Sequence, residues 1–294
     1  MKKYLLFTSD LHIGITNLTD IDILFNSALD EIHSLDGKLT AVILCGDQGE
    51  TLYHQDLCIS AIRKAIPDMP IIGTVGNHDL NPYYDQMDDT YKRYEEYIYH
   101  IFKQHNAIYL DVEDVYKIDN IAIVGNIGWY DYSALNHKNL TLPAQYWQNQ
   151  KFIQRIYPDY LVNWLPDDIR FAEKCRNKII DNIKILEKDK DIKDIIAITH
   201  QPILYKEIRD IVGWGKHDCT IDFMFYHPTL GKQIKKYNKL KCVVSGHIHE
   251  GTKITMDRGN NPLYFYTIRS EYKAPGYLLI EVGNYNNSFT DQLV

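Results

Sequence analysis

The chain lacks the features that mark several large classes of protein. Its five cysteines are an odd number and form no Cys-x-x-Cys pair, which argues against a disulfide framework and against a thiolate zinc site. The apolar run at the N-terminus stops at Thr8-Ser9-Asp10, short of the ~7–15 apolar residues that a signal peptide needs. No stretch approaches the ~20 apolar residues of a membrane span. We therefore expect a soluble, cytoplasmic protein without a membrane partner.

Long basic runs are also absent. The 32 lysines and arginines are outnumbered by 39 aspartates and glutamates, so the formal net charge is −7. A general electrostatic attraction for nucleic acid is therefore not favoured, although a local basic groove is compatible with this charge. Hydrophobic residues make up 45% of the 294 positions and charged residues 24%, which is typical of a globular protein with a sizeable core.

Short apolar runs alternate with helical patterns along most of the chain. Apolar residues recur at helical spacing over 21–35 and 172–186, which predicts amphipathic helices. Such alternation predicts an α/β fold with parallel strand pairing. Buried strands are expected over residues 4–8, 41–45, 71–75, 121–124, 195–199 and 242–245. After about Ser245, three strands with short turns are expected over 252–255, 263–268 and 277–282, and the simplest arrangement for them is a meander.

Residues 129–168 differ from the rest because they are rich in aromatics and show no clean periodicity. Linkers are poor in aromatic residues, so we interpret this segment as an insertion that packs on the main domain. The expected organisation is a single domain over residues 1–294 with an insertion at about 129–168.

Polar residues that can bind metal follow five of the six expected strands. The carboxyl ends of parallel strands share one edge of a sheet, so residues far apart in sequence are expected to meet there. The candidates are Asp10, His12, Asp47, Asn77, His78, Asp79, His200, His247 and His249.

Carboxylate, imidazole and amide oxygen, without thiolate, suit divalent Mn, Fe, Zn or Co. Seven ligands are too many for one ion that keeps an open position, whereas two ions sharing one carboxylate would use all of them. Two metal ions ~3.5–4 Å apart can stabilise both the attacking and the leaving oxygen of phosphoryl transfer.

These motifs resemble those of the calcineurin-like metallophosphoesterases. The resemblance lies in Asp10-x-His12, Gly46-Asp47, the run from Gly76 to Asp79, His200 and Gly246-His247-x-His249, in that order along most of the chain. The family fold is a four-layer α/β/β/α sandwich of two mixed β-sheets flanked by helices. The second motif departs from the pattern, since Gly46-Asp47-Gln48-Gly49-Glu50 is interpreted as lacking the further acidic residue that many members have after Gly-Asp.

The resemblance implies a role for each matched residue. One divalent ion would be bound by Asp10, His12 and His249, a second by Asn77, His200 and His247, and Asp47 would bridge both. His78 would face the scissile phosphate as general acid or transition-state stabiliser. Asp79 would hydrogen-bond and orient the His78 ring.

The implied function is hydrolysis of a phosphate mono- or diester by a metal-bound hydroxide. The expected substrate is a small molecule contacted by His217 and Tyr130, while nucleic acid is compatible but not favoured. Two alternatives are a catalytically idle protein-binding scaffold of the same fold and a nuclease. The sequence indicates neither the natural substrate, nor the metal, nor the oligomeric state.

Overall fold

The computed structural model describes residues 1–294 except 84, 87–88, 135–141, 205–226 and 294. Its strands form two mixed sheets of six strands each. In the first sheet the order is β12 (Asn284–Leu293), β11 (Gly276–Glu281), β1 (Lys2–Thr8), β2 (Gly37–Cys45), β3 (Ile71–Thr74) and β4 (Ile108–Tyr109). In the second it is β5 (Val115–Ile118), β6 (Ile121–Gly125), β7 (Asp194–Ile198), β8 (Leu240–Ser245), β10 (Leu263–Thr267) and β9 (Thr252–Met256).

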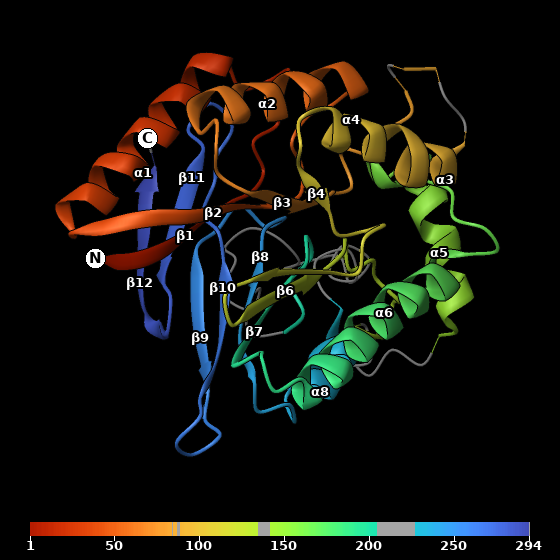
Figure 1. The fold of residues 1–294 in the computed structure, drawn as a ribbon. Coiled ribbons are helices and arrows are strands. Elements are labelled where there is room, and N and C mark those ends of the chain that lie inside the picture. The colour runs from red at the N-terminus through yellow and green to blue at the C-terminus, as the bar shows by residue number, and fades with distance from the viewer. Residues whose placement is uncertain (84, 87–88, 135–141, 205–226, 294) are drawn as a thin grey trace.

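Helices cover the outer face of each sheet (Figure 1). Among the described residues, no helix has both the length and the apolar composition needed to cross a membrane. The helices are α1 (Leu18–Ser34), α2 (Leu52–Ala65), α3 (Thr90–Lys92), α4 (Ile98–Gln104), α5 (Ala144–Ile153), α6 (Asp168–Lys188) and α8 (Pro228–Ile234), with a π-helical turn at Arg93–Tyr97 and a 3-10 turn at Asp159–Leu161.

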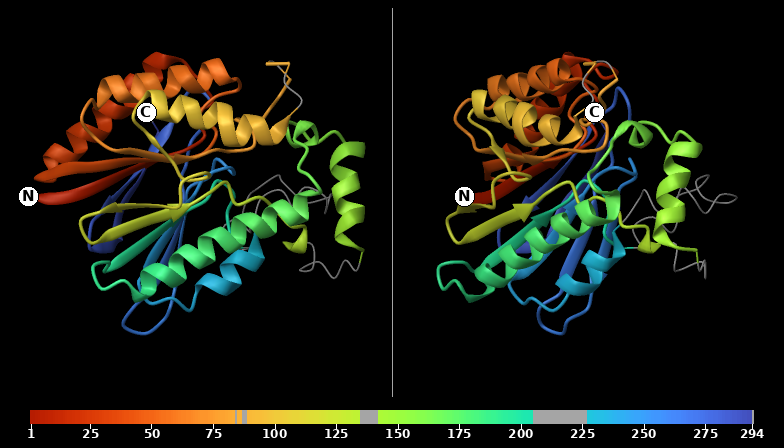
Figure 2. Two further views of the ribbon diagram at one scale, coloured as in Figure 1. Left: turned by 45° about the vertical axis from the view of Figure 1, so that its right-hand side comes forward. Right: turned by 90° about the vertical axis from the view of Figure 1, so that its right-hand side faces the viewer.

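Three buried clusters separate four layers, which Figure 2 shows from the side. Strand β1 shows how one strand contributes to two clusters, because successive side chains of a strand point to opposite faces of the sheet. Tyr4 and Leu6 pack with residues of α1 and α2, whereas Leu5 and Phe7 pack against the second sheet. The third cluster lies between the second sheet and the helices α6 and α8. The predicted α/β/β/α sandwich is confirmed.

The predicted meander after Ser245 is wrong. β9 and β10 pair with each other, and β10 also pairs in parallel with β8 in the second sheet. β11 instead lies in the first sheet, antiparallel to β1. There it buries Leu278 and Ile280 in the core between the two sheets. The burial of this apolar face, which short turns in the sequence do not reveal, decides the pairing.

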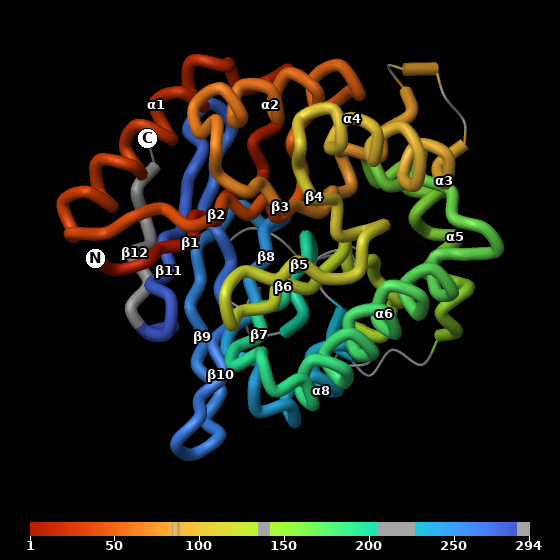
Figure 3. Tube along the Cα trace, viewed as in Figure 1, coloured from red at the N-terminus to blue at the C-terminus, as the bar shows by residue number. Residues whose placement is uncertain are grey.

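The aromatic segment 129–168 packs at one end of the layers. The trace in Figure 3 shows α5 at the edge of the molecule, far from the end where α1 and β12 lie. Trp129 and Trp164 are buried in the same cluster as residues of β1, α1 and α2. The segment thus shares a core with the first sheet and its helices.

Candidate metal centre

The candidate side chains follow strands of both sheets. β1, β2 and β3 are parallel neighbours in the first sheet, and β7 and β8 are parallel neighbours in the second. Among the described residues, three groups of possible metal ligands result, and within each group the ligand atoms lie within 4.8 Å of one another. The groups are Asp10, His12 and His249; His12, Glu50 and His78; and Asp47, His200 and His247.

The first group joins the end of β1 to the end of β8. His249 Nε2 lies 3.7 Å from Asp10 Oδ1. The rings of His12 and His249 stack with their centroids 5.3 Å apart. The Asp10 carboxylate also accepts the backbone N–H of His247, at 3.0 Å, which ties the two strand ends together.

The group of Asp47, His200 and His247 joins the ends of β2, β7 and β8, and Asn77, which follows β3, lies beside it. His200 Nε2 lies 3.2 Å from Asp47 Oδ2 and 3.1 Å from His247 Nδ1. The amide oxygen of Asn77 lies 3.0 Å from His200 Nε2 and 3.1 Å from His247 Nδ1. Four donor atoms therefore converge on a small volume.

One carboxylate oxygen connects the two groups. Asp47 Oδ2 lies 3.2 Å from His200 Nε2 and 3.6 Å from His12 Nε2. The other oxygen, Oδ1, accepts the backbone N–H of His78 at 2.9 Å. Asp47 therefore faces the ligand atoms of both groups.

The hydrogen bonds of the imidazoles show that these donors fit divalent cations. His200 Nδ1 donates to the backbone oxygen of Cys45, and His249 Nδ1 donates to that of Ser270. His12 Nδ1 faces a carboxylate oxygen of Glu50 at 3.0 Å. In a neutral imidazole held this way, Nε2 keeps its lone pair, as in metal-binding histidines.

Those lone pairs are directed at other acceptors. His12 Nε2 is buried without a hydrogen-bond partner in the part of the chain that the structure describes. Nε2 of His200 faces a carboxylate oxygen of Asp47, and Nε2 of His249 faces a carboxylate oxygen of Asp10. Acceptors directed at acceptors are unfavourable unless a proton or a cation lies between them. The donor set is therefore compatible with two divalent ions.

Unusual backbone conformations aim five of the candidate ligands. Asp10, His12, Asp47, His247 and His249 all have positive φ, between 43° and 73°. On an extended strand, side chains two residues apart point to the same face of the sheet. The left-handed backbone at these positions turns the side chains in different directions. Such strained positions cluster at functional sites.

Glycine is required where strand-end loops touch. A Cβ on Gly246 would collide with Ser9 Oγ, and a Cβ on Gly76 would collide with Asp47 Oδ1. The absence of a side chain at both positions lets backbone approach the candidate ligands closely. The strand-end motifs thus need their glycines for packing as well as for turning.

The carboxylate at the His78 ring is Glu50, so the predicted contact between Asp79 and that ring is wrong. His78 Nδ1 lies 3.0 Å from Glu50 Oε1. Asp79 points the other way, because its two oxygens accept the backbone N–H groups of Gly49 and Gly76, at 3.0 and 2.8 Å. Asp79 therefore joins the loops after β2 and β3.

Glu50 is the site residue that the sequence analysis missed. It contacts both His12 and His78, and it stands three residues after Asp47 in the same strand-end loop. Contrary to the interpretation of that motif, an acidic residue after Gly46-Asp47 is present and used. Its spacing from Asp47 was the available signal.

Charges raise or lower the pKa values of the site in the metal-free protein. Burial opposes ionisation of Glu50, but hydrogen bonds from His12 and His78 lower its pKa to about 2. Burial likewise opposes protonation of His78 and His200, but the Asp47 carboxylate, helped at His78 by Glu50, raises both pKa values to about 9. The site therefore holds ionised carboxylates against cationic imidazoles when no metal is bound.

The aromatic segment supports Asn77. The amide nitrogen of Asn77 donates to Asp159 Oδ2 at 3.0 Å, which turns the amide oxygen towards His200 and His247. Tyr130, proposed from the sequence as a substrate contact, is fully buried, and its hydroxyl donates to Asp159 Oδ1. The other proposed substrate contact, His217, lies outside the described residues.

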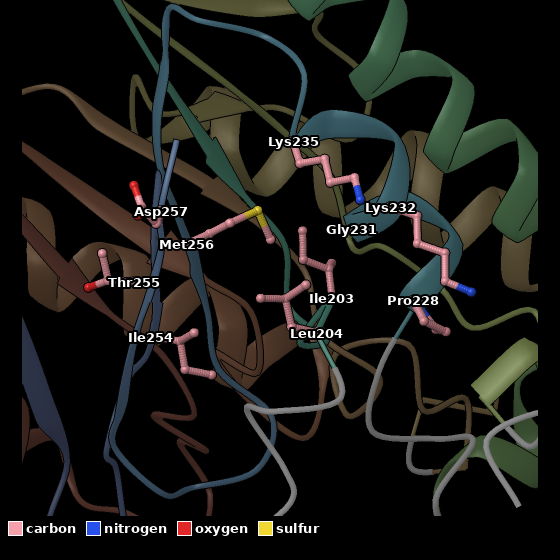
Figure 4. A pocket seen from close by; sticks show the side chains of 10 residues that line it. All are labelled: Ile203, Leu204, Pro228, Gly231, Lys232, Lys235, Ile254, Thr255, Met256 and Asp257. Carbon is pink, nitrogen blue, oxygen red and sulfur yellow. The ribbon is translucent and has the colours of Figure 1, made fainter. Parts of the chain in front are cut away.

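A separate pocket of about 400 Å³ lies between α8 and β9 (Figure 4). Its wall includes Ile203, Leu204, Ile254 and Met256, with Lys232 among its other lining residues. None of its ten lining residues is a candidate metal ligand. This pocket is therefore separate from the candidate metal ligands.

Comparison with protein families decides the relationship. The model of the calcineurin-like phosphoesterases matches residues 4–251. The chain belongs to this family. The match includes every candidate ligand, and in a calcineurin-like phosphoesterase His/Asp groups of this geometry are consistent with a dimetal site. A comparison with curated proteins finds no match.

Solved structures show the same fold at low sequence identity. A phosphopantetheinyl hydrolase from Mycobacterium tuberculosis superimposes with a TM-score of 0.68 at 17% identity, over 92% of this chain and 90% of that one. A dimetal phosphatase from Danio rerio gives 0.53 at 12%, over 99% of each chain. The protein TT1561 of Thermus thermophilus gives 0.55 at 13%, over the whole of both chains.

Proposed function

We propose that this calcineurin-like phosphoesterase is a dinuclear metal-dependent hydrolase of phosphate mono- or diesters. The observation that supports this most is the single oxygen of Asp47 that faces both ligand groups, with imidazole lone pairs directed at the same volume. A site built for one ion would not need a carboxylate in that position.

The proposed ligands are divided between two ions. Asp10, His12 and His249 would hold the first ion, Asn77, His200 and His247 the second, and Asp47 both. Divalent Mn, Fe, Zn and Co all suit these donors. When bound, two such ions supply positive charge that stabilises the attacking and leaving oxygens of phosphoryl transfer.

His78 is the proposed general acid. Its ring is only partly exposed, at 16% of the side chain, and Glu50 fixes it through Nδ1. Nε2, the nitrogen opposite, is then free to donate a proton to the leaving oxygen of a bound ester. In the metal-free protein, the carboxylates of Asp47 and Glu50 raise its pKa to about 9.

The test uses nitrophenyl phosphate mono- and diesters after chelation and refilling with Mn, Fe, Co or Zn. Asp47→Asn should weaken binding of both ions and abolish turnover. His78→Ala should keep the metal content and lower kcat by about 10²–10⁴-fold. Asp257→Asn, which alters an exposed carboxylate at the separate pocket, is the matched control and should leave both measurements unchanged.

Two outcomes would contradict the proposal. Full turnover by Asp47→Asn would show that the bridging carboxylate has no part in the reaction. A wild-type protein that binds the metals but hydrolyses neither ester with any of them would support the idle scaffold instead.

A further inference from the structure

Residues 157–159 of the aromatic segment contact the loop that follows β3 at three points. The Tyr157 hydroxyl accepts a hydrogen bond from Asn81 Nδ2 at 2.6 Å. Asp159 accepts from Asn77 at 3.0 Å. Between these contacts, the Tyr157 ring meets the His78 ring edge to face, with centroids 5.9 Å apart and planes at 79°. The segment therefore positions an aromatic ring beside the proposed general acid.

The Tyr157 ring is held in place and is half exposed. It is 48% exposed, whereas Trp129 and Trp164 of the same segment are at most 1% exposed. A fixed, half-exposed ring next to a reacting group is suited to stacking on a planar part of a ligand.

We propose that Tyr157 forms the subsite for the leaving alcohol, and that the substrates are phosphate esters whose alcohol contains a planar aromatic ring. This inference rests on the proposed function. If His78 protonates the leaving oxygen, the alcohol extends from phosphorus on the His78 side, where the Tyr157 ring lies. In the reaction, water adds to phosphorus, the ester P–O bond breaks, and the alcohol oxygen receives the proton of His78. The proton that the water loses passes to solvent, and solvent later reprotonates the His78 ring.

Another half-exposed tyrosine, Tyr272, borders the centre. Its ring is 4.8 Å from the His12 ring and 5.0 Å from the His249 ring, measured between centroids. Both histidines are proposed ligands of the first ion, whereas the Tyr157 ring contacts the ring of the proposed acid itself. The leaving alcohol is therefore placed at Tyr157, and Tyr272 is the alternative that the experiment tests.

Benzyl phosphate and cyclohexylmethyl phosphate form a matched pair of substrates. Their alcohols are similar in size and acidity, but only one contains a planar ring. If the enzyme prefers diesters, the same comparison is made with the methyl diesters of the two phosphates. With the metal-loaded wild type we expect kcat/KM to favour the benzyl ester by about 10-fold, which corresponds to ~1.4 kcal/mol and lies within the range for stacking on an aromatic side chain.

Variants of the aromatic segment distinguish loss of ring stacking from a general loss of structure. Tyr157→Ala should remove the preference, chiefly by raising KM for the benzyl ester, whereas Tyr157→Phe should retain it. Tyr146→Ala is the control, because Tyr146 belongs to the same segment, is 43% exposed and packs against Trp147. It should leave the ratio of the two substrates unchanged. Calorimetry with benzylphosphonate and cyclohexylmethylphosphonate should give the same preference in Kd.

The results distinguish the inference from the function beneath it. Equal kcat/KM for the two esters, a preference that survives Tyr157→Ala, or a preference that depends on Tyr272 would overturn the inference alone. If the loaded protein hydrolysed neither these esters nor the nitrophenyl esters, the proposed function would fail and the inference with it.

Discussion

Glu50 has the most consequential contacts of any single side chain outside the proposed ligand set. Its carboxylate lies between the imidazoles of His12 and His78, and it is ionised in the metal-free protein. It therefore orients one proposed ligand and the proposed acid together. Carboxylates that hold metal-binding histidines commonly affect both affinity and rate.

Replacing Glu50 by glutamine tests this role. Glu50→Gln keeps a hydrogen-bonding oxygen but removes the negative charge that helps to raise the pKa of His78. Because the acid must be protonated, we expect the basic limb of the kcat profile to move to lower pH, by about one unit, with kcat at pH 8 reduced by about 10-fold. The measurement is a pH–rate profile.

Asp79→Asn is the comparison variant. Asp79 accepts backbone N–H groups and does not contact the His78 ring. Its variant should leave the position of the basic limb unchanged, even if stability falls. A shift with Asp79→Asn and none with Glu50→Gln would show that the assignment is reversed.

The paired charges of Asp47 and His200 predict how the metal-free protein responds to pH. The pKa of His200 is about 9 in the folded state and ~6.5 when unfolded. The raised value means that the pair stabilises the fold fully below pH 6.5, and that this contribution is lost as the pH rises to 9. In EDTA, the Tm should fall by at least a few degrees across that window.

Urea or thermal unfolding at several pH values checks this expectation. Asp47→Asn removes the carboxylate that raises the pKa of His200 and of His78. The variant should therefore show a smaller fall in stability over the same window. A wild-type Tm that stays constant from pH 6.5 to 9 would contradict the proposed charge pairing.

Strand-end loops of the two sheets contact the opposite sheet at two places. The loop after β8 meets the loop after β1, where Gly246 packs on Ser9 and the Asp10 carboxylate accepts the N–H of His247. The loop after β7 meets β2, where His200 donates to the Cys45 oxygen. The strands aim the ligands, and the glycines permit the close approach.

Gly246→Ala tests the contact between the first two of these loops. The added Cβ would collide with Ser9 Oγ and crowd Asp10 Oδ2, which moves the β8 loop away from the β1 loop. We expect metal affinity to fall by about 10-fold or more and the free energy of unfolding to fall by about 1–3 kcal/mol. Equilibrium dialysis with elemental analysis measures the affinity.

Gly259→Ala is a matched control. Gly259 has φ of +70°, and a Cβ there would meet nothing within 4 Å. The substitution therefore introduces backbone strain without disturbing the centre, and metal affinity should be unchanged. Equal losses of affinity in the two variants would show that the loss does not depend on the collision at Ser9.

Both proposed ions are held between the two sheets. The first group takes Asp10 and His12 from the first sheet and His249 from the second, and the second group is divided in the same way. Metal ions bound there would therefore cross-link two layers that also pack through a shared apolar core. Metal binding at this centre should therefore affect the stability of both sheets.

Metal binding should accordingly stabilise the entire fold. Ions that bind only the folded state add about 2.7 kcal/mol to the free energy of unfolding at 100 times Kd. Urea titrations with and without metal measure this gain. Hydrogen exchange should show slower exchange in the strand-end loops of both sheets together, and protection confined to one sheet would contradict a shared site.

The sequence alone determined the chemistry that is available. Each strand-end motif is local, because a few apolar residues followed by Gly, Asp, Asn or His specify a buried strand and the polar turn after it. The ligand types, their order and the α/β layers could therefore be predicted, together with strands such as β1 and β8.

Only the tertiary structure decided which of these groups meet. Glu50 and not Asp79 reaches His78, β11 joins the first sheet, and Asp159 of the aromatic segment turns Asn77 towards the histidines. These contacts depend on how two sheets stack and where loops distant in sequence approach. The burial of entire faces sets that arrangement, and no short stretch of sequence contains it.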